Sequence, residues 1–230
     1  YLARAALHLE RSNWQNALAD LKRGIGPRSS YRPLYELGLL AAYLDQPADY
    51  EFATRELAKR FTSDVRSTAG AFSVWTATLL PNGFKDDRDL MSVAEARLEA
   101  TPSDVASNRN LGAILYRAGQ FEKALEALEE ADRLLGKLEH RNTSPAYTWY
   151  FLALTHHALG HESLAKEFLN KANQRANQEL DAEDPVLWNR RLTLKLLRQE
   201  AQELIHVANP VPPATGHQSP NAESRLKEAA

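Results

Sequence analysis

The sequence predicts an all-α protein built from a row of paired helices, on three observations. Apolar residues recur with helical spacing along almost the whole chain, and no segment alternates apolar and polar residues for long enough to form a sheet. Glycine, proline and small polar residues interrupt these periodic segments at intervals typical of turns. Two of the segments repeat one pattern of small and large residues 41 positions apart.

The periodicity predicts five helix pairs and one final helix. Asp184 before Pro185 has the form of an N-cap with proline in the first turn, and Ser103 and Ser144 are similar cap candidates. The expected pairs are 1–11 with 13–25, 32–45 with 48–61, 63–80 with 87–100, 104–118 with 121–136, and 145–159 with 161–178, and the final helix covers 185–207.

Turn-forming residues separate the helices. Gly119 and Gly160 stand where helices should end, because glycine readily takes the left-handed conformation found there. Pro-Asn-Gly at 81–83 interrupts the third pair and predicts a wider turn. The last segment is rich in proline and small polar residues, so we expect a helical domain over 1–208 and a flexible tail over 209–230.

The repeat is clearest in "LGAILYRAGQFEKALEALEEA" at 111–131 and "LALTHHALGHESLAKEFLNKA" at 152–172. Leu111, Gly112, Gly119, Ala124, Leu128 and Ala131 match Leu152, Ala153, Gly160, Ala165, Leu169 and Ala172. The same pattern of small and large residues is found in the first two pairs. Its residues are Ala5, Trp14, Ala17, Leu21 and Gly24 in the first pair, and Leu37, Ala41, Tyr50, Ala53 and Leu57 in the second. The 71 residues from Ala53 to Ala124 leave room for one more repeat, around Trp75 and Leu90.

Gly112 stands in mid-helix, where glycine is unfavourable. Ala153, Ala41 and Ala5 take the same place in the other repeats, so a small residue is expected where two helices touch. We therefore predict that Gly112→Leu overpacks this crossing, whereas Gly112→Ala is mild or even stabilising.

In Gly112, Gly119, Phe121, Ala124 and Ala131 the pattern resembles the tetratricopeptide repeat (TPR), a helix-turn-helix unit of about 34 residues. The resemblance implies a right-handed superhelical solenoid of about five helix pairs. It also implies that the final helix caps the array, because each repeat buries its face only against a neighbour. An alternative is that Trp188 anchors another protein or domain.

A narrower resemblance covers most of the chain. Its residues are "LYELGLLAAYLDQPADYEFATRELAKRF" at 34–61, the Trp-containing helix before 81–83, the two repeats above and "LWNRRLTLKLLRQEAQELI" at 187–205. This succession is similar to the C-terminal repeat region of large planctomycete-type bacterial proteins, where such regions follow serine/threonine kinase domains or WD40 propellers. The start at Tyr1, in mid-pattern and without methionine, fits a fragment of a larger protein.

The TPR resemblance implies a protein-interaction module that binds through the concave face, which the first helix of each repeat lines. Tyrosine and arginine are enriched in binding surfaces, and they predict an acidic or C-terminal peptide with an apolar anchor, or a neighbouring domain. The residues expected to face this peptide-binding groove are Tyr35, Arg109, Tyr116, Arg117, Tyr147, Tyr150 and His157. Alternatively, these tyrosines cover neighbouring helices, or the last helix lies in the groove.

Composition excludes several other functions. The net charge of −2 gives no positive field for nucleic acid or an anionic membrane, and no apolar run is long enough to span a bilayer. The absence of cysteine excludes thiol chemistry and agrees with a cytoplasmic protein.

A second functional hypothesis follows from the narrower resemblance: the chain is a regulatory region that acts in cis within a larger bacterial kinase or WD40 protein.

No catalytic or metal motif is recognisable, so we expect no enzyme activity and no cofactor. "HHALGH" at 156–161 puts His157 and His161 four apart, but it lacks the glutamate of zinc proteases, and Gly160 ends the helix between them. "HRN" at 140–142 lacks the aspartate of a kinase loop, and "DDRD" at 86–89 lacks the glycine and glutamate of a calcium loop.

Overall fold

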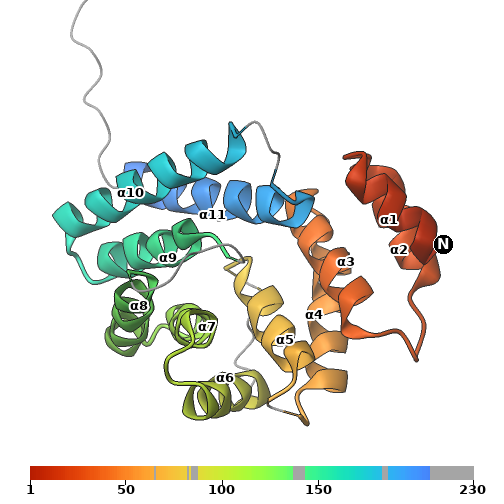
Figure 1. Ribbon diagram of the computed structural model, residues 1–230, viewed down its shortest axis with the longest axis horizontal. Helices are drawn as coiled ribbons and strands as arrows, with labels where there is room; N and C mark the ends of the chain where they lie inside the picture. The colour runs from red at the N-terminus through yellow and green to blue at the C-terminus, as the bar shows by residue number, and fades with distance from the viewer. Residues whose placement is uncertain (65, 82, 84–87, 137–142, 183–185, 208–230) are drawn as a thin grey trace, which may run out of the picture.

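The computed structural model describes residues 1–64, 66–81, 83, 88–136, 143–182 and 186–207, and it confirms the predicted all-α class (Figure 1). The described residues form eleven α-helices and no strand. None of these helices combines the length and the apolar character needed to cross a membrane.

The helices form five consecutive antiparallel pairs followed by α11. The pairs are α1 (Leu2–Glu10) with α2 (Trp14–Gly24), α3 (Tyr31–Tyr43) with α4 (Pro47–Phe61), α5 (Thr68–Thr78) with α6 (Arg88–Ala100), α7 (Val105–Arg117) with α8 (Phe121–Leu135), and α9 (Pro145–Ala158) with α10 (Glu162–Leu180). The final helix, α11, covers Trp188–Val207. The predicted pairing is therefore confirmed, with most boundaries displaced by one or two residues.

Two predicted helix starts are wrong. The helix expected from residue 63 begins at Thr68, because the Ser67 hydroxyl caps it by accepting the Gly70 N–H at 3.0 Å. The helix expected from 185 begins at Trp188. The proposed cap formed by Asp184 and Pro185 lies outside the described residues.

Of the other two predicted caps, one is confirmed and one is wrong. The Ser144 hydroxyl accepts the Ala146 N–H at 3.2 Å at the start of α9. Ser103 does not cap α7. The neighbouring Asp104 does so instead, because its carboxylate reaches the Ser107 N–H at 2.9 Å.

Four of the pairs share the same three-residue turn. Its middle residue has positive φ in each case: 56° at Ser12, 53° at Asp45, 74° at Gly119 and 77° at Gly160. The next N–H bonds to the carbonyl five residues earlier, as from Gln120 to Leu115 at 3.0 Å, which is the Schellman arrangement. The predicted role of the two glycines is confirmed, and Ser12 and Asp45 take the same conformation without being glycine.

The small residues of the repeat lie at the helix crossings, as predicted. Ala5, Ala41, Ala153, Ala17, Ala53, Ala124 and Ala165 are all fully buried. At Gly112 a Cβ atom would lie only 2.5 Å from Leu128 Cγ and 3.1 Å from the Ala124 carbonyl oxygen. These contacts count against the expectation that Gly112→Ala is stabilising, because the Leu128 side chain must shift to admit a methyl group.

The inner helices form a closed ring. α3, α5, α7 and α9 are successive neighbours, α11 packs on α9, and α11 also reaches α3 (Figure 1). At this end of α11, Trp188 meets Trp14 of α2 with ring centroids 6.3 Å apart. The final helix therefore covers the end of the array and also closes its concave side. Its buried residues Leu192, Leu194, Leu197, Ala201 and Ile205 join the main core.

Candidate functional site

The predicted binding groove is occupied by α11. Arg117, at the end of α7, forms a buried ion pair with Glu200 of α11, with 2.7 Å between Nη2 and Oε2. The same guanidinium donates from Nε to the Thr78 carbonyl oxygen of α5 at 2.9 Å. Arg117 thus connects α5, α7 and α11, and its side chain is only 2% exposed.

Three predicted groove tyrosines also contact α11. The Tyr35 hydroxyl accepts from Asn189 Nδ2 at 3.5 Å, the Tyr147 hydroxyl donates to the Arg190 carbonyl at 3.5 Å, and the Tyr150 hydroxyl accepts from Arg198 Nε at 3.1 Å. Burial raises the pKa of Tyr35 to about 12 and also raises the pKa of Tyr147 and Tyr150, so these hydroxyls keep their protons.

The other three predicted groove residues form no hydrogen bond with the described residues of α11. The Arg109 guanidinium lies between the rings of Trp75 and Tyr147. Tyr116 is half-buried against aromatic rings, and burial raises its pKa to about 12. The His157 ring lies at the α9–α10 turn, with Nδ1 3.5 Å from Glu162 Oε1. The structure thus brings four of the seven residues together against α11, and peptide binding by the seven stays a prediction.

The histidines of 156–161 form a pair at this turn. His156 Nδ1 lies 3.2 Å from His161 Nδ1, and the buried His156 ring stacks on Phe168. Burial, followed by the charge of His161, lowers the pKa of His156. Within the described residues, no three His, Asp or Glu side chains are grouped so as to hold a metal. The motif at 140–142, and residues 86 and 87 of the acidic run, lie outside those residues.

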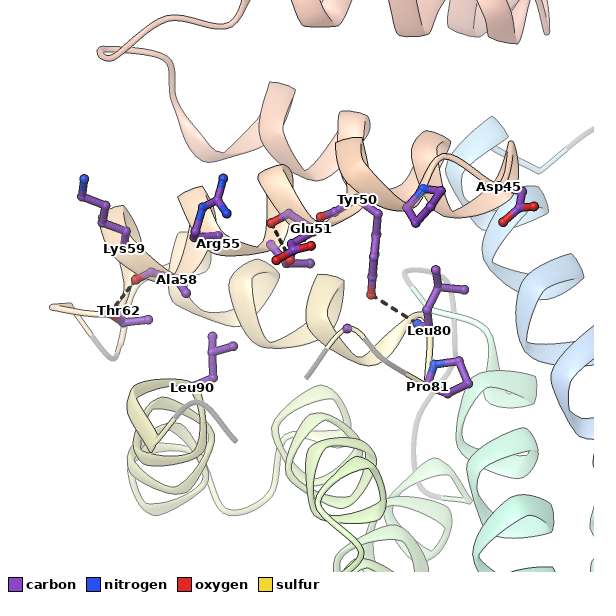
Figure 2. Close-up of a pocket in the computed structure, with 13 residues that line it drawn as sticks. Asp45, Tyr50, Glu51, Arg55, Ala58, Lys59, Thr62, Leu80, Pro81 and Leu90 are labelled. Carbon is purple, nitrogen blue, oxygen red and sulfur yellow. Dashed lines mark hydrogen bonds between the residues drawn. The ribbon is translucent and has the colours of Figure 1, made fainter. Parts of the chain in front are cut away.

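A cleft of about 800 Å³ lies beside α4, and sequence reasoning missed it (Figure 2). One face of α4 forms a wall along the whole length of that helix, and the end of α5, its turn and α6 form the other. The lining residues are Asp45, Pro47, Tyr50, Glu51, Thr54, Arg55, Ala58, Lys59 and Thr62 on the α4 side, and Leu80, Pro81, Gly83 and Leu90 opposite. The predicted wide turn at 81–83 was the signal available in the sequence.

Tyr50 fixes the geometry of this cleft. Its hydroxyl donates to the Thr76 carbonyl at 2.6 Å and accepts the Leu80 N–H at 3.2 Å, so α4 holds the end of α5 (Figure 2). Gly83 packs on the same hydroxyl, from which a Cβ atom would be only 2.2 Å away. The side chain is fully buried, which raises the pKa of Tyr50.

Charge is distributed unevenly along the cleft. Arg55 and Lys59 are exposed one helical turn apart near the C-terminal end of α4, and neither forms an ion pair or hydrogen bond with another described residue. Asp45 lies at the other end, and Glu51 lies between, one helical turn from Arg55 (Figure 2). Apolar surface comes from Ala58 and Leu90 at the Lys59 end of the cleft and from Leu80 near Tyr50 (Figure 2).

The comparisons with known proteins add little. No protein-family model matches the chain, and no curated protein matches it either. Solved structures of MamA AMB-1 and MamA MSR-1 are similar, with 16% and 15% sequence identity and TM-scores of 0.44 and 0.42. Each alignment covers 76% of this chain, and 96% and 94% of those chains. Values this low support no inference about function, and nothing found supports the narrower resemblance to regions that follow kinase or WD40 domains.

Proposed function

We propose that the chain is a protein-interaction scaffold that holds an acidic peptide segment of a partner protein in the cleft beside α4. The observation that carries this proposal is the contrast between two surfaces. The concave face is filled by α11, whereas no described residue fills the cleft beside α4, which is lined along a whole helix face. A helical array that offers one long cleft suits peptide recognition better than catalysis.

The charges of the cleft define the partner's chemistry. Two exposed cations one turn apart favour carboxylates in the bound segment. The apolar surface at Ala58 and Leu90 favours one aliphatic or aromatic side chain beside them. Asp45, beyond the opposite end of α4, disfavours acidic residues there. This charge favours a bound segment that has its acidic end over Arg55 and Lys59.

The test uses an array of nine-residue peptides that carry two glutamates and one leucine or phenylalanine, with lysine replacing glutamate in a matched set. The full chain should bind members of the acidic set in fluorescence polarisation. The double variant Arg55→Glu, Lys59→Glu should weaken that binding about tenfold or more, because it replaces attraction by repulsion.

The control variant is Arg133→Glu, which reverses an exposed cation on α8, far along the chain from the cleft. It should leave the affinity unchanged. Absence of specific binding by the acidic set would overturn the proposed function, and so would equal affinity of the wild type and the double variant.

A further inference from the structure

The C-terminal end of α5 is held by side chains from two other helices. The last carbonyl groups of a helix have no partner within that helix and need other donors. Tyr50 of α4 donates to the Thr76 carbonyl at 2.6 Å. Arg117 of α7 donates to the Thr78 carbonyl from Nε at 2.9 Å and from Nη2 at 2.8 Å. The position of this end therefore depends on both side chains.

The segment that follows this end forms one wall of the cleft beside α4. Leu80, Pro81 and Gly83, here named the α5-end wall, line the cleft opposite α4 (Figure 2). The Leu80 N–H donates to the Tyr50 hydroxyl at 3.2 Å, and the Gly83 N–H donates to the Leu80 carbonyl at 3.1 Å. A change in how the end of α5 is held must therefore change this wall.

Glu200 of α11 fixes the guanidinium that holds Thr78. Its Oε2 lies 2.7 Å from Nη2 of Arg117, and its Oε1 pairs with Nη1, so the contact is bidentate and sets the plane of the guanidinium. The Arg117 side chain is 2% exposed and lies over the rings of Tyr116 and Phe151. A buried cation is costly without a carboxylate partner. Glu200 therefore decides whether Arg117 stays in the place from which it reaches α5.

α11 itself lies outside the cleft. No described residue of α11 lines the cleft, and α11 packs mainly on α9, α10 and α3. Burial raises the pKa of Tyr50, and the charges of Arg117 and Glu200 both act on that hydroxyl, in opposite directions. The contacts of Glu200 with Arg117 and of Arg117 with Thr78 therefore link α11 to a cleft that it does not line.

We propose that α11 regulates the cleft beside α4, with Glu200 and Arg117 as positioning residues for the α5-end wall. With α11 in the ring, both donors of Arg117 reach the Thr78 carbonyl and the wall is held. A partner that draws α11 out of the ring weakens the cleft through the same contacts. A peptide bound in the cleft strengthens the seating of α11, because coupling between two sites is reciprocal. The inference rests on the proposed function for the peptide whose affinity it concerns, but the link itself needs no peptide.

The first test measures hydrogen exchange of the full chain without peptide. Glu200→Gln keeps the size of the side chain and removes its charge, and exchange at Leu79 and Leu80 should accelerate about fivefold or more relative to α8. Arg198→Met is the control on α11, because the Arg198 guanidinium bonds α9 and α10 and no described residue of α5. It should leave exchange at Leu80 unchanged. Wild-type exchange in Glu200→Gln, or equal acceleration in both variants, would overturn the link.

The second test separates position from stability. The double variant Arg117→Met, Glu200→Met leaves neither charge buried, so it should fold with most of the wild-type stability, but the Thr78 carbonyl has lost its donor. Exchange at Leu80 should therefore remain fast in this variant. A return to the wild-type rate would show that Arg117 and Glu200 act through stability alone, and it would overturn their positioning role.

The third test measures binding of the tightest-binding acidic nine-residue peptide by fluorescence polarisation. Glu200→Gln should weaken this binding about threefold or more, and Arg198→Met should leave it unchanged. If the wild type and Glu200→Gln bind the peptide equally well, the regulation is overturned. Absence of binding by the wild type would overturn the proposed function instead, and the two exchange tests would then decide whether α11 holds the α5-end wall.

Discussion

The α7–α8 and α5–α6 hairpins are held together in different ways. In α7–α8, a three-residue turn with positive φ at Gly119 and the close crossing at Gly112 fix the pair from within. In α5–α6 the turn is wide, and side chains of other helices hold the end of α5. Tyr50 of α4 bonds Thr76 and Leu80, and Arg117 of α7 bonds Thr78.

This difference shows that the short turn is dispensable in one repeat when neighbouring repeats supply the missing hydrogen bonds. Leu80, Pro81, Gly83 and Leu90 of this irregular repeat line the cleft beside α4 (Figure 2). The regular hairpins should thus be sensitive to changes in their own small residues, and the irregular one to changes in distant side chains.

Removing the Arg117 guanidinium, which holds the end of α5 from α7, should have the largest effect on stability. Arg117→Met leaves Glu200 buried without its cation, and we expect a loss of about 3 to 5 kcal/mol in the free energy of unfolding. Urea denaturation measures the loss. The double variant Arg117→Met, Glu200→Met should recover most of it, since neither charge remains. Equal losses in the single and double variants would show that the ion pair is not the cause.

Substitutions at Gly112 test how closely α7 and α8 pack within their own hairpin. We expect Gly112→Leu to lower the free energy of unfolding by about 3 kcal/mol and Gly112→Ala by about 1 kcal/mol, because even a Cβ atom meets Leu128. Gly26→Ala is the control, since a Cβ there has no neighbour within 4 Å. A stabilising Gly112→Ala would mean that the helices are less closely packed than described.

Removing one hydroxyl tests the support from α4. Tyr50→Phe leaves the Leu80 N–H and the Thr76 carbonyl without this partner, which should cost about 1 to 3 kcal/mol. Hydrogen exchange should accelerate at the end of α5 more than in α7. Tyr43→Phe is the matched control, because that hydroxyl bonds no other described residue. Unchanged exchange at Leu80 would argue against this anchor.

The turn conformation gives a smaller and purely local effect. Gly119→Ala should cost about 1 to 2 kcal/mol through backbone strain alone, since a Cβ at this position has no neighbour within 4 Å. Asp45→Gly, at the same place in the α3–α4 turn, should stabilise by about 1 kcal/mol or less. Thermal unfolding compares the two, and shifts of the same sign would contradict a shared turn.

The smallest expected effect is a pH dependence in the α9–α10 hairpin. Because the pKa of His156 is lowered in the folded chain, this residue contributes stability above the ordinary histidine pKa of about 6.5, and the contribution fades as the pH falls. His156→Phe should therefore flatten the decline in urea midpoint between about pH 7 and pH 5. His157→Gln, a change to the half-exposed neighbour, should leave the slope as in the wild type.

Much of the fold could be predicted because its causes are local. Helical spacing of apolar residues gave the five pairs and α11, and glycine marked two of the turns. The positive φ of Ser12 and Asp45 was not predicted, because serine and aspartate are not specific markers of that backbone conformation. The start of α5 was missed for a similar reason, since a cap bond from Ser67 decided it.

The candidate sites could be predicted only in part. Tyr35, Arg117, Tyr147 and Tyr150 contact α11, and their role in peptide binding stays a prediction. The cleft depends on how α4, α5 and α6 are placed relative to one another, and this arrangement does not belong to any single segment.

The sequence by itself therefore determined the class of fold, the helix pairing and the small residues at the crossings, because helical periodicity and steric size act over a few residues. Only the tertiary structure decided that α11 closes the ring and that the cleft lies beside α4. Those outcomes depend on contacts between residues far apart in the chain, such as Arg117 with Glu200. The local pattern of residue types along the sequence does not predict such contacts.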